Sequence, residues 1–580
     1  MKKISIGFAI LGIIVLSGYI YLRHHLGTPG EKPSPTAQAQ QQHQPATKSA
    51  ESPLDLRPLL IAKLKQLVKD GSGGLYNLFI QQADPDIVNQ TITIKELALI
   101  PDTAALQAME RERKAPDDVF KISVHSLTID GLGIADFLHK DSIRLTDIHI
   151  ISPQIEIFHK QRSYNAADKQ NLYQRLVKQF KLIAIAKIVV ENGSITVHNA
   201  SNKRPLRLNN VEVLMDHLLI DSTTQNDKQR FLFAKGANLS FKHFNLFTPD
   251  NLYEFNVGRV NITAPDGKVV ASDITLLPKG SDAAFQKSLR YNKICFHLTV
   301  PQLRMKSVYW WSFFTSDELK ADELYLDHPT CIAYLDRTLP NAPDSNIPNF
   351  PQQLLMQLKL PVHLNAVKIT DATITYKEYS PATKATGIIN LDHANITATN
   401  ATNMSVEMKK NRFTNLSATA AFMHKVPFSI NYKFDLARVR SGAFTGHISL
   451  GAIDNALANQ LAKPMGMLLI KRGQLQRATV DIHGDNTGAS GTVLMLYTDL
   501  HITPLKMNSD STGMKKKSLT SFVANTFLIK NNNPSGSGQS PRVEQAQHKR
   551  VPGGDLFNLT WKTILVGILK TIGVTAKLAD

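Results

Sequence analysis

The chain has 580 residues, a net charge of +18 and a hydrophobic fraction of 43%, which excludes a largely disordered protein. Residues 401–580 carry 22 Lys and Arg against 10 Asp and Glu, so most of the excess positive charge lies in the last third. A basic end favours an anionic partner surface, but the dense basic runs are not interleaved with aromatic residues, so we expect no nucleic-acid partner.

The first apolar segment is Ile4–Leu22, directly after Met1, Lys2 and Lys3. A helix of this length is about 28 Å long, which matches the hydrocarbon core of a bilayer. A cleaved signal peptide has a shorter apolar core, so the segment predicts an uncleaved transmembrane anchor over residues 1–26. Lys2 and Lys3 place the N-terminus in the cytoplasm, which predicts a single-pass inner-membrane protein with the bulk of the chain outside the cytoplasm.

The anchor is followed by a tether and then by a long β region. Residues 27–53 are rich in Pro, Gln, Ala and Ser and predict a disordered tether. Residues 55–69 predict an amphipathic helix that ends at the glycine run 71–74. Strand signals continue to about residue 505, with short helices at 171–181, 352–359 and 453–462. We therefore expect a mainly β body in two halves, 54–290 and 291–508, followed by a basic loop and an amphipathic helix in 509–580.

A ten-residue pattern occurs four times in the β region. Two alternating apolar residues are followed by two variable positions, by a Pro, Gly or Ala, and then by a second alternating apolar pair. Period-two spacing predicts strands, and we interpret the interruption as a turn into a second strand. The apolar positions of the four copies are Ile148, Ile150, Ile155 and Ile157; Ile188, Val190, Ile195 and Val197; Leu324, Leu326, Cys331 and Ala333; and Val367, Ile369, Ile374 and Tyr376.

The four copies form two pairs, which predicts an internal duplication. The copies start 40 residues apart in the first pair and 43 apart in the second, and an alternating strand precedes each pair, at Phe120–Val124 and at Ile294–Leu298. Self-similar strand units stack into long sheets, so we expect one elongated antiparallel sheet. Its apolar face needs a cover, which requires either that the sheet curls on itself or that another molecule occupies that face.

The polar motifs do not assemble into an enzyme. Three Asp-His dipeptides occur, but none has a third ligand at metal spacing, and no Gly-x-Ser-x-Gly elbow is present. We expect these dipeptides at turns between strands. The sequence nominates no catalytic residue, no metal ligand and no cofactor. Cys295 and Cys331 are too few for a disulfide framework; we expect buried free thiols, with a single disulfide between them as the alternative.

The last segment, Asp555–Leu578, predicts a helix with Asp555 as its N-cap. Its apolar residues recur at helical spacing, with lysines beside them. One interpretation is an amphipathic helix that contacts a membrane or a membrane partner, and the other is an end cap on the β body. The residues concerned are Phe557, Trp561, Ile564, Leu565, Ile568 and Ile572.

Several segments, taken in order, resemble AsmA-like proteins, and the resemblance runs from about residue 54 to residue 575. The similar segments are Gly74–Asn77, Ile94–Thr103, Asp147–Ile157, Lys471–Asp485, Ala489–Leu500, Phe527–Pro534 and Phe557–Lys562.

Larger members of that family, such as TamB-like proteins, are inner-membrane-anchored periplasmic β-grooves that carry phospholipid toward the outer membrane. The resemblance implies a curled, taco-like groove lined by the apolar positions of the four copies. It further implies a phospholipid or another acyl-chain lipid as ligand, and a role in outer-membrane biogenesis and envelope homeostasis. The alternative is a non-enzymatic periplasmic scaffold for outer-membrane protein assembly, which predicts polar residues on both faces of the strands.

Overall fold

The computed structural model describes residues 57–573, except for 87, 132–141, 161, 166–181, 200–204, 222, 225–226, 249, 317, 342–348, 508–513 and 517–528. The predicted anchor, the predicted tether and the predicted helix 171–181 lie outside these residues. None of the described helices is long and apolar enough to cross a membrane.

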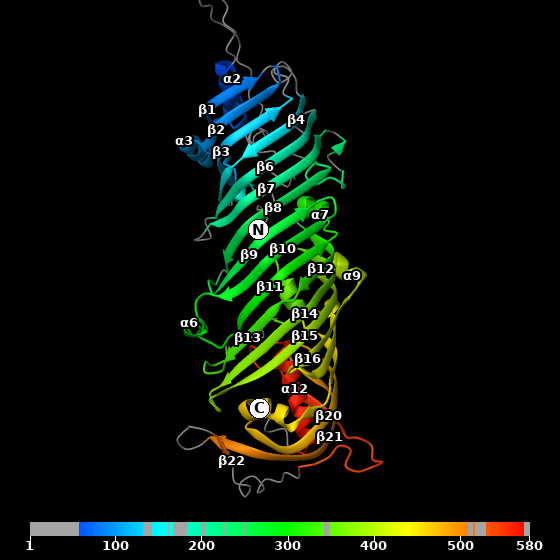
Figure 1. Cartoon of the computed structure of the whole chain (residues 1–580). Helices are drawn as coiled ribbons and strands as arrows, with labels where there is room; N and C mark the ends of the chain where they lie inside the picture. Colours follow the sequence, from blue (N-terminus) through cyan, green and yellow to red (C-terminus); the bar gives the residue numbers. More distant parts are fainter. Residues whose placement is uncertain are drawn as a thin grey trace, which may run out of the picture. The chain divides into compact units, whose positions relative to one another are not determined.

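The described part of the chain is mainly β with a few short helices, as the sequence predicts (Figure 1). The helices are α2 (Arg57–Gly71), α3 (Thr103–Arg111), α6 (Asp282–Lys287), α7 (Trp310–Ser316), α8 (Pro351–Met356), α9 (Ser405–Lys410), α10 (Asn455–Gly466) and α12 (Leu556–Thr571), with 3-10 turns at Ser163–Asn165 and Leu436–Arg438. The predicted helices near residues 55–69, 352–359 and 453–462 are thus confirmed.

Strands make up most of the remainder. They are β1 (Tyr76–Asp86), β2 (Thr91–Pro101), β3 (Asp118–Asp130), β4 (Ser142–Ile151), β5 (Gln154–His159), β6 (Leu182–Asn199), β7 (Leu206–Ile220), β8 (Gly236–Phe247), β9 (Tyr253–Thr263), β10 (Lys268–Pro278), β11 (Cys295–Lys306), β12 (Leu319–Asp327), β13 (Thr330–Asp336), β14 (Val362–Ser380), β15 (Ala385–Thr402), β16 (Phe413–Phe422), β17 (Val426–Asp435), β18 (Phe444–Leu450), β19 (Ile453–Asp454), β20 (Leu468–Gly484), β21 (Gly488–Met507), β22 (Met514–Lys516) and β23 (Val543–Lys549).

The chain divides into two compact units. The first holds the described residues up to Phe244 together with Asn261–Pro265 and Phe314–Ser316, and the second holds Asn245–Val260, Asp266–Phe313 and the described residues from Glu318 onward. In the first unit, β1, β2 and β3 form an antiparallel meander. In the second, β14 to β18, β20, β21 and β23 pair antiparallel in chain order.

The expectation of a purely antiparallel sheet is wrong at one place in each unit. β4 and β5 both pair in parallel with β6, and β12 and β13 both pair in parallel with β14. The connection from β5 to β6 is 22 residues long, and that from β13 to β14 is 25. Parallel neighbours need such long crossover connections, because the chain must return to the starting end before the next strand begins.

The interruption in the ten-residue pattern is a bulge, so its interpretation as a turn is wrong. The residue before the Pro, Gly or Ala has a positive φ in all four copies: 49° at Ser152, 52° at Asn192, 50° at His328 and 53° at Asp371. In the second and fourth copies a single strand, β6 or β14, continues through it. A bulge adds one residue, so the apolar positions on both sides of it return to the same face.

The register explains the spacing of the copies. Within each pair, equivalent apolar residues are direct partners in the parallel pairing, so the offsets of 40 and 43 residues are the register itself. The preceding strands, β3 and β11, pair antiparallel with both parts of the next copy. The two units therefore share one strand topology, as the predicted duplication requires. The partners include Ile148 with Ile188, Ile155 with Ile195, Leu324 with Val367, and Cys331 with Ile374.

The Asp-His dipeptides also occupy bulges and not the turns that we expected. His217, His328 and His393 have φ of 53°, 50° and 51°. His217 lies inside β7 and His393 inside β15, while His328 separates β12 from β13. Two of the histidines lie against Asp371: His393 Nδ1 is 2.7 Å from its Oδ1, and His328 Nε2 is 3.4 Å from its Oδ2.

Candidate functional site

The candidate site is the apolar face of β11 to β15 in the second unit. Residues that are partners in the register project from the same face, and here three rows cross the strands with apolar residues at every position. We call these twelve residues the apolar strip: Leu303, Leu326, Ile369 and Ile396; Leu298, Cys331, Ile374 and Leu391; and Phe296, Ala333, Tyr376 and Ile389.

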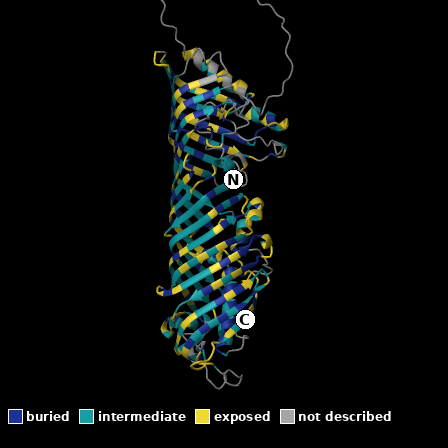
Figure 2. Cartoon of the chain, turned by 90° about the vertical axis from the view of Figure 1, so that its right-hand side faces the viewer, coloured by how far each residue is buried: buried dark blue, intermediate teal, exposed yellow. Residues whose placement is uncertain are grey.

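The apolar strip is only partly covered. Ala333 is 9% exposed and Phe296 is 40% exposed, and the other members are half-buried. Figure 2 shows that intermediate exposure is common along the strands of the sheet. With strands 4.8 Å apart and a rise of 3.3 Å per residue, the strip is about 14 Å across and about 20 Å along β14. A lipid tail spans half of a 30 Å hydrocarbon core, or about 15 Å, so the strip is long enough for an extended acyl chain.

Packed clusters border the apolar strip along the strands. On one side, Val308, Ala321, Val362 and Leu364 form a buried cluster against which Trp310 of α7 packs. On the other side α10 closes over the strand ends, where Leu457 packs with Met423 and Val426. Gly387 of β15 provides the space for this helix, because a Cβ there would come within 2.5 Å of Met465 Cγ.

Helix α12 packs on the same apolar face, farther along the sheet. Asp555 is its N-cap, as predicted, and accepts a hydrogen bond from Asn558 N at 2.7 Å. The side of the helix with small residues faces the sheet: a Cβ on Gly567 would lie 2.3 Å from Val493 Cγ2. The buried Thr560 and Tyr432 hydroxyls are hydrogen-bonded at 2.8 Å. This packing is what the end-cap interpretation expects.

The six residues predicted for this helix fall into two groups. Ile572 is 3% exposed and belongs to the core beneath the helix, with Ile564, Leu565 and Ile568 half-buried against that core. Trp561 is half-buried, and Phe557 is 50% exposed. The Phe557 ring lies 5.3 Å from the ring of Tyr376, a member of the apolar strip. The exposed end of α12 therefore adjoins the strip.

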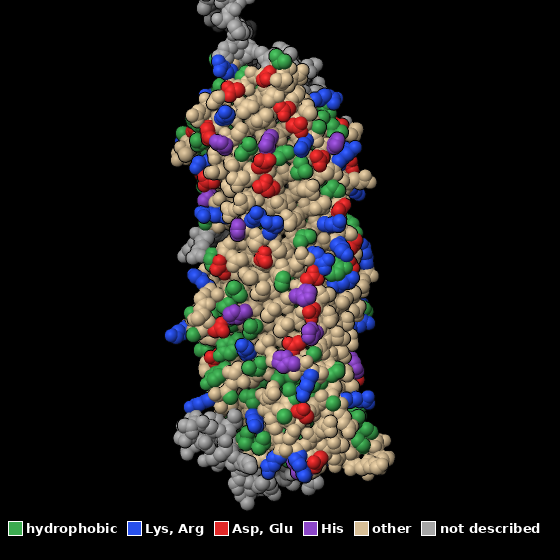
Figure 3. All heavy atoms as spheres, in the orientation of Figure 1, with side chains coloured by type: hydrophobic (Ala, Val, Ile, Leu, Met, Phe, Trp, Pro, Cys, Tyr) green, Lys and Arg blue, Asp and Glu red, His purple; other side chains and the backbone are tan. Residues whose placement is uncertain are grey.

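The opposite face of the same strands is polar. One row runs from Arg304 through Tyr325, Lys368 and Thr397 to residues of β16, β17, β18, β20 and β21, each residue being the register partner of the next. Lys368 pairs with Glu323, and this ion pair lowers the pKa of Glu323 to about 2. Charged and histidine side chains are spread over the face shown in Figure 3.

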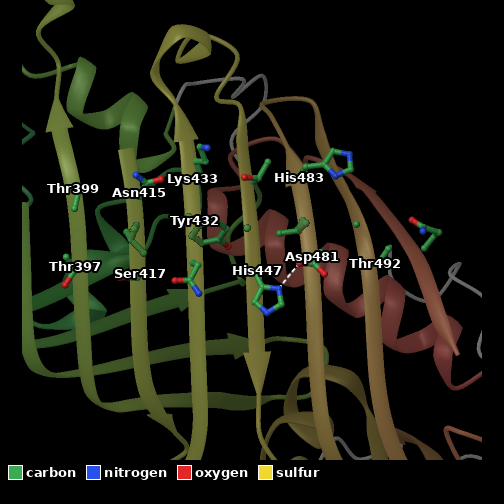
Figure 4. Close-up of a pocket in the computed structure, with 17 residues that line it drawn as sticks. Thr397, Thr399, Asn415, Ser417, Tyr432, Lys433, His447, Asp481, His483 and Thr492 are labelled. Carbon is green, nitrogen blue, oxygen red and sulfur yellow. Dashed lines mark hydrogen bonds and ion pairs between the residues drawn. The ribbon is translucent and has the colours of Figure 1, made fainter. Parts of the chain in front are cut away.

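A shallow depression on this polar face lies over β15 to β21 and β23 (Figure 4). Its wall includes Thr397, Ser417, Asn431, His447 and Asp481, and His447 Nδ1 lies 2.7 Å from Asp481 Oδ1. In Figure 4 α12 lies behind these strands, on the other side of the sheet. The two faces of the second unit thus differ sharply in polarity.

Polar groups within the apolar strip are neutral at physiological pH. The Tyr376 hydroxyl donates a hydrogen bond to Glu378 Oε2 at 2.6 Å. Burial is the main cause that raises the pKa of Tyr376, and the negative charge of Glu378 raises it further. Burial also raises the pKa of the Cys331 thiol. Both cysteines are free, so the alternative of a disulfide is not realised. The strip therefore presents no charge to a ligand.

The sixteen predicted lining positions divide between the units. In the first unit they are buried, from 0% exposed at Ile188 to 5% at Ile157, except for the half-buried Val197. In the second unit all are half-buried except Ala333. Half of the apolar strip was not predicted, because β11 and β15 lack the ten-residue pattern. The sequences of β11 and β15 show only simple alternation of apolar residues. The register places Leu298, Leu303, Leu391 and Ile396 beside the predicted positions.

No protein-family model matches the chain, and no curated protein matches it. The resemblance to AsmA-like proteins remains a prediction from the sequence.

Proposed function

We propose that this protein is an inner-membrane-anchored periplasmic protein that binds acyl-chain lipid in a curled β-groove, and that it transfers lipid for outer-membrane biogenesis. The observation that supports the proposal most is the apolar strip, a half-exposed apolar surface of uniform composition opposite a polar face. Contiguous apolar surfaces of this kind mark binding sites for apolar partners. The predicted anchor at residues 1–26 and the segments that resemble AsmA-like proteins support the location.

The binding energy sets a condition on the ligand. Each buried methylene contributes about 0.8 kcal/mol, so ten methylenes contribute about 8 kcal/mol. Association itself costs about 4–15 kcal/mol in lost freedom and ordering. A tail must therefore lie along most of the strip to be held stably, and a two-tailed phospholipid meets this condition more easily than a short fatty acid.

Curling of the second unit is supported by α12. This helix of 16 residues contacts Tyr376 of β14 near its start and lies against Val493 of β21 near its end. Six neighbouring pairings separate these two strands, a distance of about 29 Å in a flat sheet. The helix is about 24 Å long, so both contacts fit best if the sheet bends around it. Bulges such as that at Asp371 increase the local twist and favour this bend.

The rival scaffold function predicts polar residues on both faces. The register places Leu326, Ile369 and Ile396 in one row and Tyr325, Lys368 and Thr397 in the adjacent row on the other side. The second unit thus has one apolar and one polar face, which favours lipid binding over a purely polar docking surface.

The test places a photo-crosslinking amino acid on each face of β14 in the full-length chain expressed in Gram-negative cells. Ile374 and Thr375 are adjacent, so they sample opposite faces at the same depth of the strand. After irradiation, mass spectrometry of the purified chain should find lipid adducts at position 374 and none at position 375. Equal lipid labelling at both positions, or protein adducts alone at position 374, would contradict lipid binding; the second result would favour the scaffold.

A further inference from the structure

Three side chains that commonly bind metals meet at the start of β11. Cys295 and His297 are two residues apart on the strand and therefore project from the same face. Asp282 is the first residue of α6, and Ser281 is the N-cap of that helix. Cys295 Sγ lies 3.9 Å from both His297 Nε2 and Asp282 Oδ1. Those two atoms are 2.7 Å apart.

The arrangement differs from a catalytic relay. In a Cys-His-Asp relay the thiol and the carboxylate contact different nitrogens of the imidazole ring. Here Cys295 and Asp282 both approach Nε2 of His297. The three atoms are therefore close enough together to bind one ion.

The separations are within about 0.6 Å of those in a tetrahedral zinc site. Bonds of about 2.3 Å to sulfur and 2.0–2.1 Å to nitrogen or oxygen place tetrahedral ligands about 3.3–3.6 Å apart. The two distances from Cys295 must shorten by about 0.3 Å, and the hydrogen-bonded pair of His297 and Asp282 must open by about 0.6 Å. These are side-chain adjustments, and Asp282 has a half-exposed side chain that can make them.

The surroundings suit a bound ion. Cys295 is 0% exposed, and its neighbours Phe285 and Tyr253 are also buried, with their rings 5.3 Å apart. An apolar shell of this kind excludes water from the sulfur and strengthens electrostatic contacts. The side chains of His297 and Asp282 are 31% and 50% exposed, which leaves an entry path from solvent. A thiolate, an imidazole and a carboxylate together favour Zn²⁺ over Mg²⁺ or Ca²⁺.

We propose that Cys295, His297 and Asp282 bind one Zn²⁺ ion, with a fourth position open to water, and that the ion fastens α6 to the start of β11. On binding, the Cys295 thiol releases its proton to solvent, and His297 binds through Nε2 as the neutral ring with its proton on Nδ1. The site lies outside the apolar strip, and it does not depend on lipid binding.

The test uses the full-length chain, purified in detergent without a polyhistidine tag, stripped with a chelator and titrated with ZnCl₂ against a chromophoric chelator. One equivalent should bind. Cys295→Ala and His297→Gln should each weaken binding by more than the 10–100-fold that loss of an outer-shell partner causes. Cys331→Ala is the matched control and should bind as the unsubstituted chain does, because Cys331 faces Leu298 in the apolar strip.

Cobalt provides a second readout of the same ligands. The chain loaded with Co²⁺ should show a thiolate-to-metal charge-transfer band that is present in Cys331→Ala and absent in Cys295→Ala. Cys295 is buried, whereas the side chain of Asp282 is half-exposed. If Cys295→Ala prevents folding, Asp282→Asn therefore still tests the site in a folded chain. The absence of a bound equivalent, or equal Zn²⁺ affinity in the unsubstituted chain and in the folded site variants, would overturn the proposal.

Discussion

The contact between Gly567 and Val493 makes the packing of α12 testable. A Cβ at Gly567 would lie 2.3 Å from Val493 Cγ2 and 2.7 Å from Val493 Cβ. The helix would have to move by about 1 Å to restore ordinary contact, and overpacking of this kind costs about 1–3 kcal/mol. Alanine regains about 1 kcal/mol of helix propensity. Gly567→Ala should therefore destabilise the second unit by about 1–2 kcal/mol. This value is the upper half of the overpacking cost, about 2–3 kcal/mol, minus the gain of about 1 kcal/mol in helix propensity.

A double-mutant cycle separates this clash from other effects. Val493→Ala alone removes two buried methyl groups and should cost about 2 kcal/mol. It also removes the closest atom to the new Cβ and leaves only the Val493 Cβ at 2.7 Å, so the double variant should be more stable than the sum of the single changes by more than about 0.5 kcal/mol. Gly536→Ala is the matched control, since a Cβ there meets only Gln539 at 3.7 Å or more.

Urea unfolding of the full-length chain gives the free energies, and hydrogen exchange over residues 556–571 shows whether the effect is local to α12. Loosening should appear there first, because the helix must leave Val493 and Ala546. If Gly567→Ala is as stable as Gly536→Ala, or if the cycle is additive within about 0.5 kcal/mol, the close packing of α12 on β21 is refuted.

Three further outcomes follow from the second unit. The ion pair with Arg412 holds the pKa of Asp435 at about 2, below its unfolded value near 3.9. The stability that the folded protein gains from this lowered pKa is therefore complete above about pH 4 and is lost as the pH falls toward 2. Arg412→Gln should therefore lower the free energy of unfolding at pH 7 and change it little at pH 2, and an equal effect at both pH values would argue against the ion pair. Ile374→Asp should abolish lipid co-purification while Thr375→Asp leaves it intact; retention of lipid in Ile374→Asp would exclude the apolar strip as the site. A maleimide should label Cys331 several-fold more slowly in chain that retains lipid than in delipidated chain, and equal rates would place the lipid elsewhere.

Local sequence patterns predicted the strands well and their connections poorly. Alternation at Ile188, Val190, Ile195 and Val197 predicts a strand, and all four lie in β6. The same pattern cannot distinguish a turn from a bulge, because both interrupt the alternation at Asn192. The decision depends on the neighbours: β4 and β5 continue along β6 on both sides of the interruption, so the strand extends through it. Pairing between distant segments is not encoded in ten residues.

The zinc cluster shows a different limit. Cys295 and His297 are two residues apart, and Asp282 precedes them by only 13 residues, but a Cys-x-His spacing without further ligands is too common to single out. The link is made by α6, which starts at Asp282 and returns the chain to β11. Burial of Cys295 among Tyr253 and Phe285 likewise depends on β9 and α6 meeting at that strand end.

The two units show that a strand face can be apolar without being accessible to solvent. Ile155 and Cys331 are equivalent in the ten-residue pattern, and both pair with an isoleucine in the same register. Ile155 is 2% exposed, whereas Cys331 is half-buried. Strand topology and bulge are shared, so they do not account for this difference in exposure. Among the described residues the equivalent rows are accessible only in the second unit, so under the proposed function changes at Ile155 or Ile195 test the stability of a core, whereas changes at Ile374 test lipid binding.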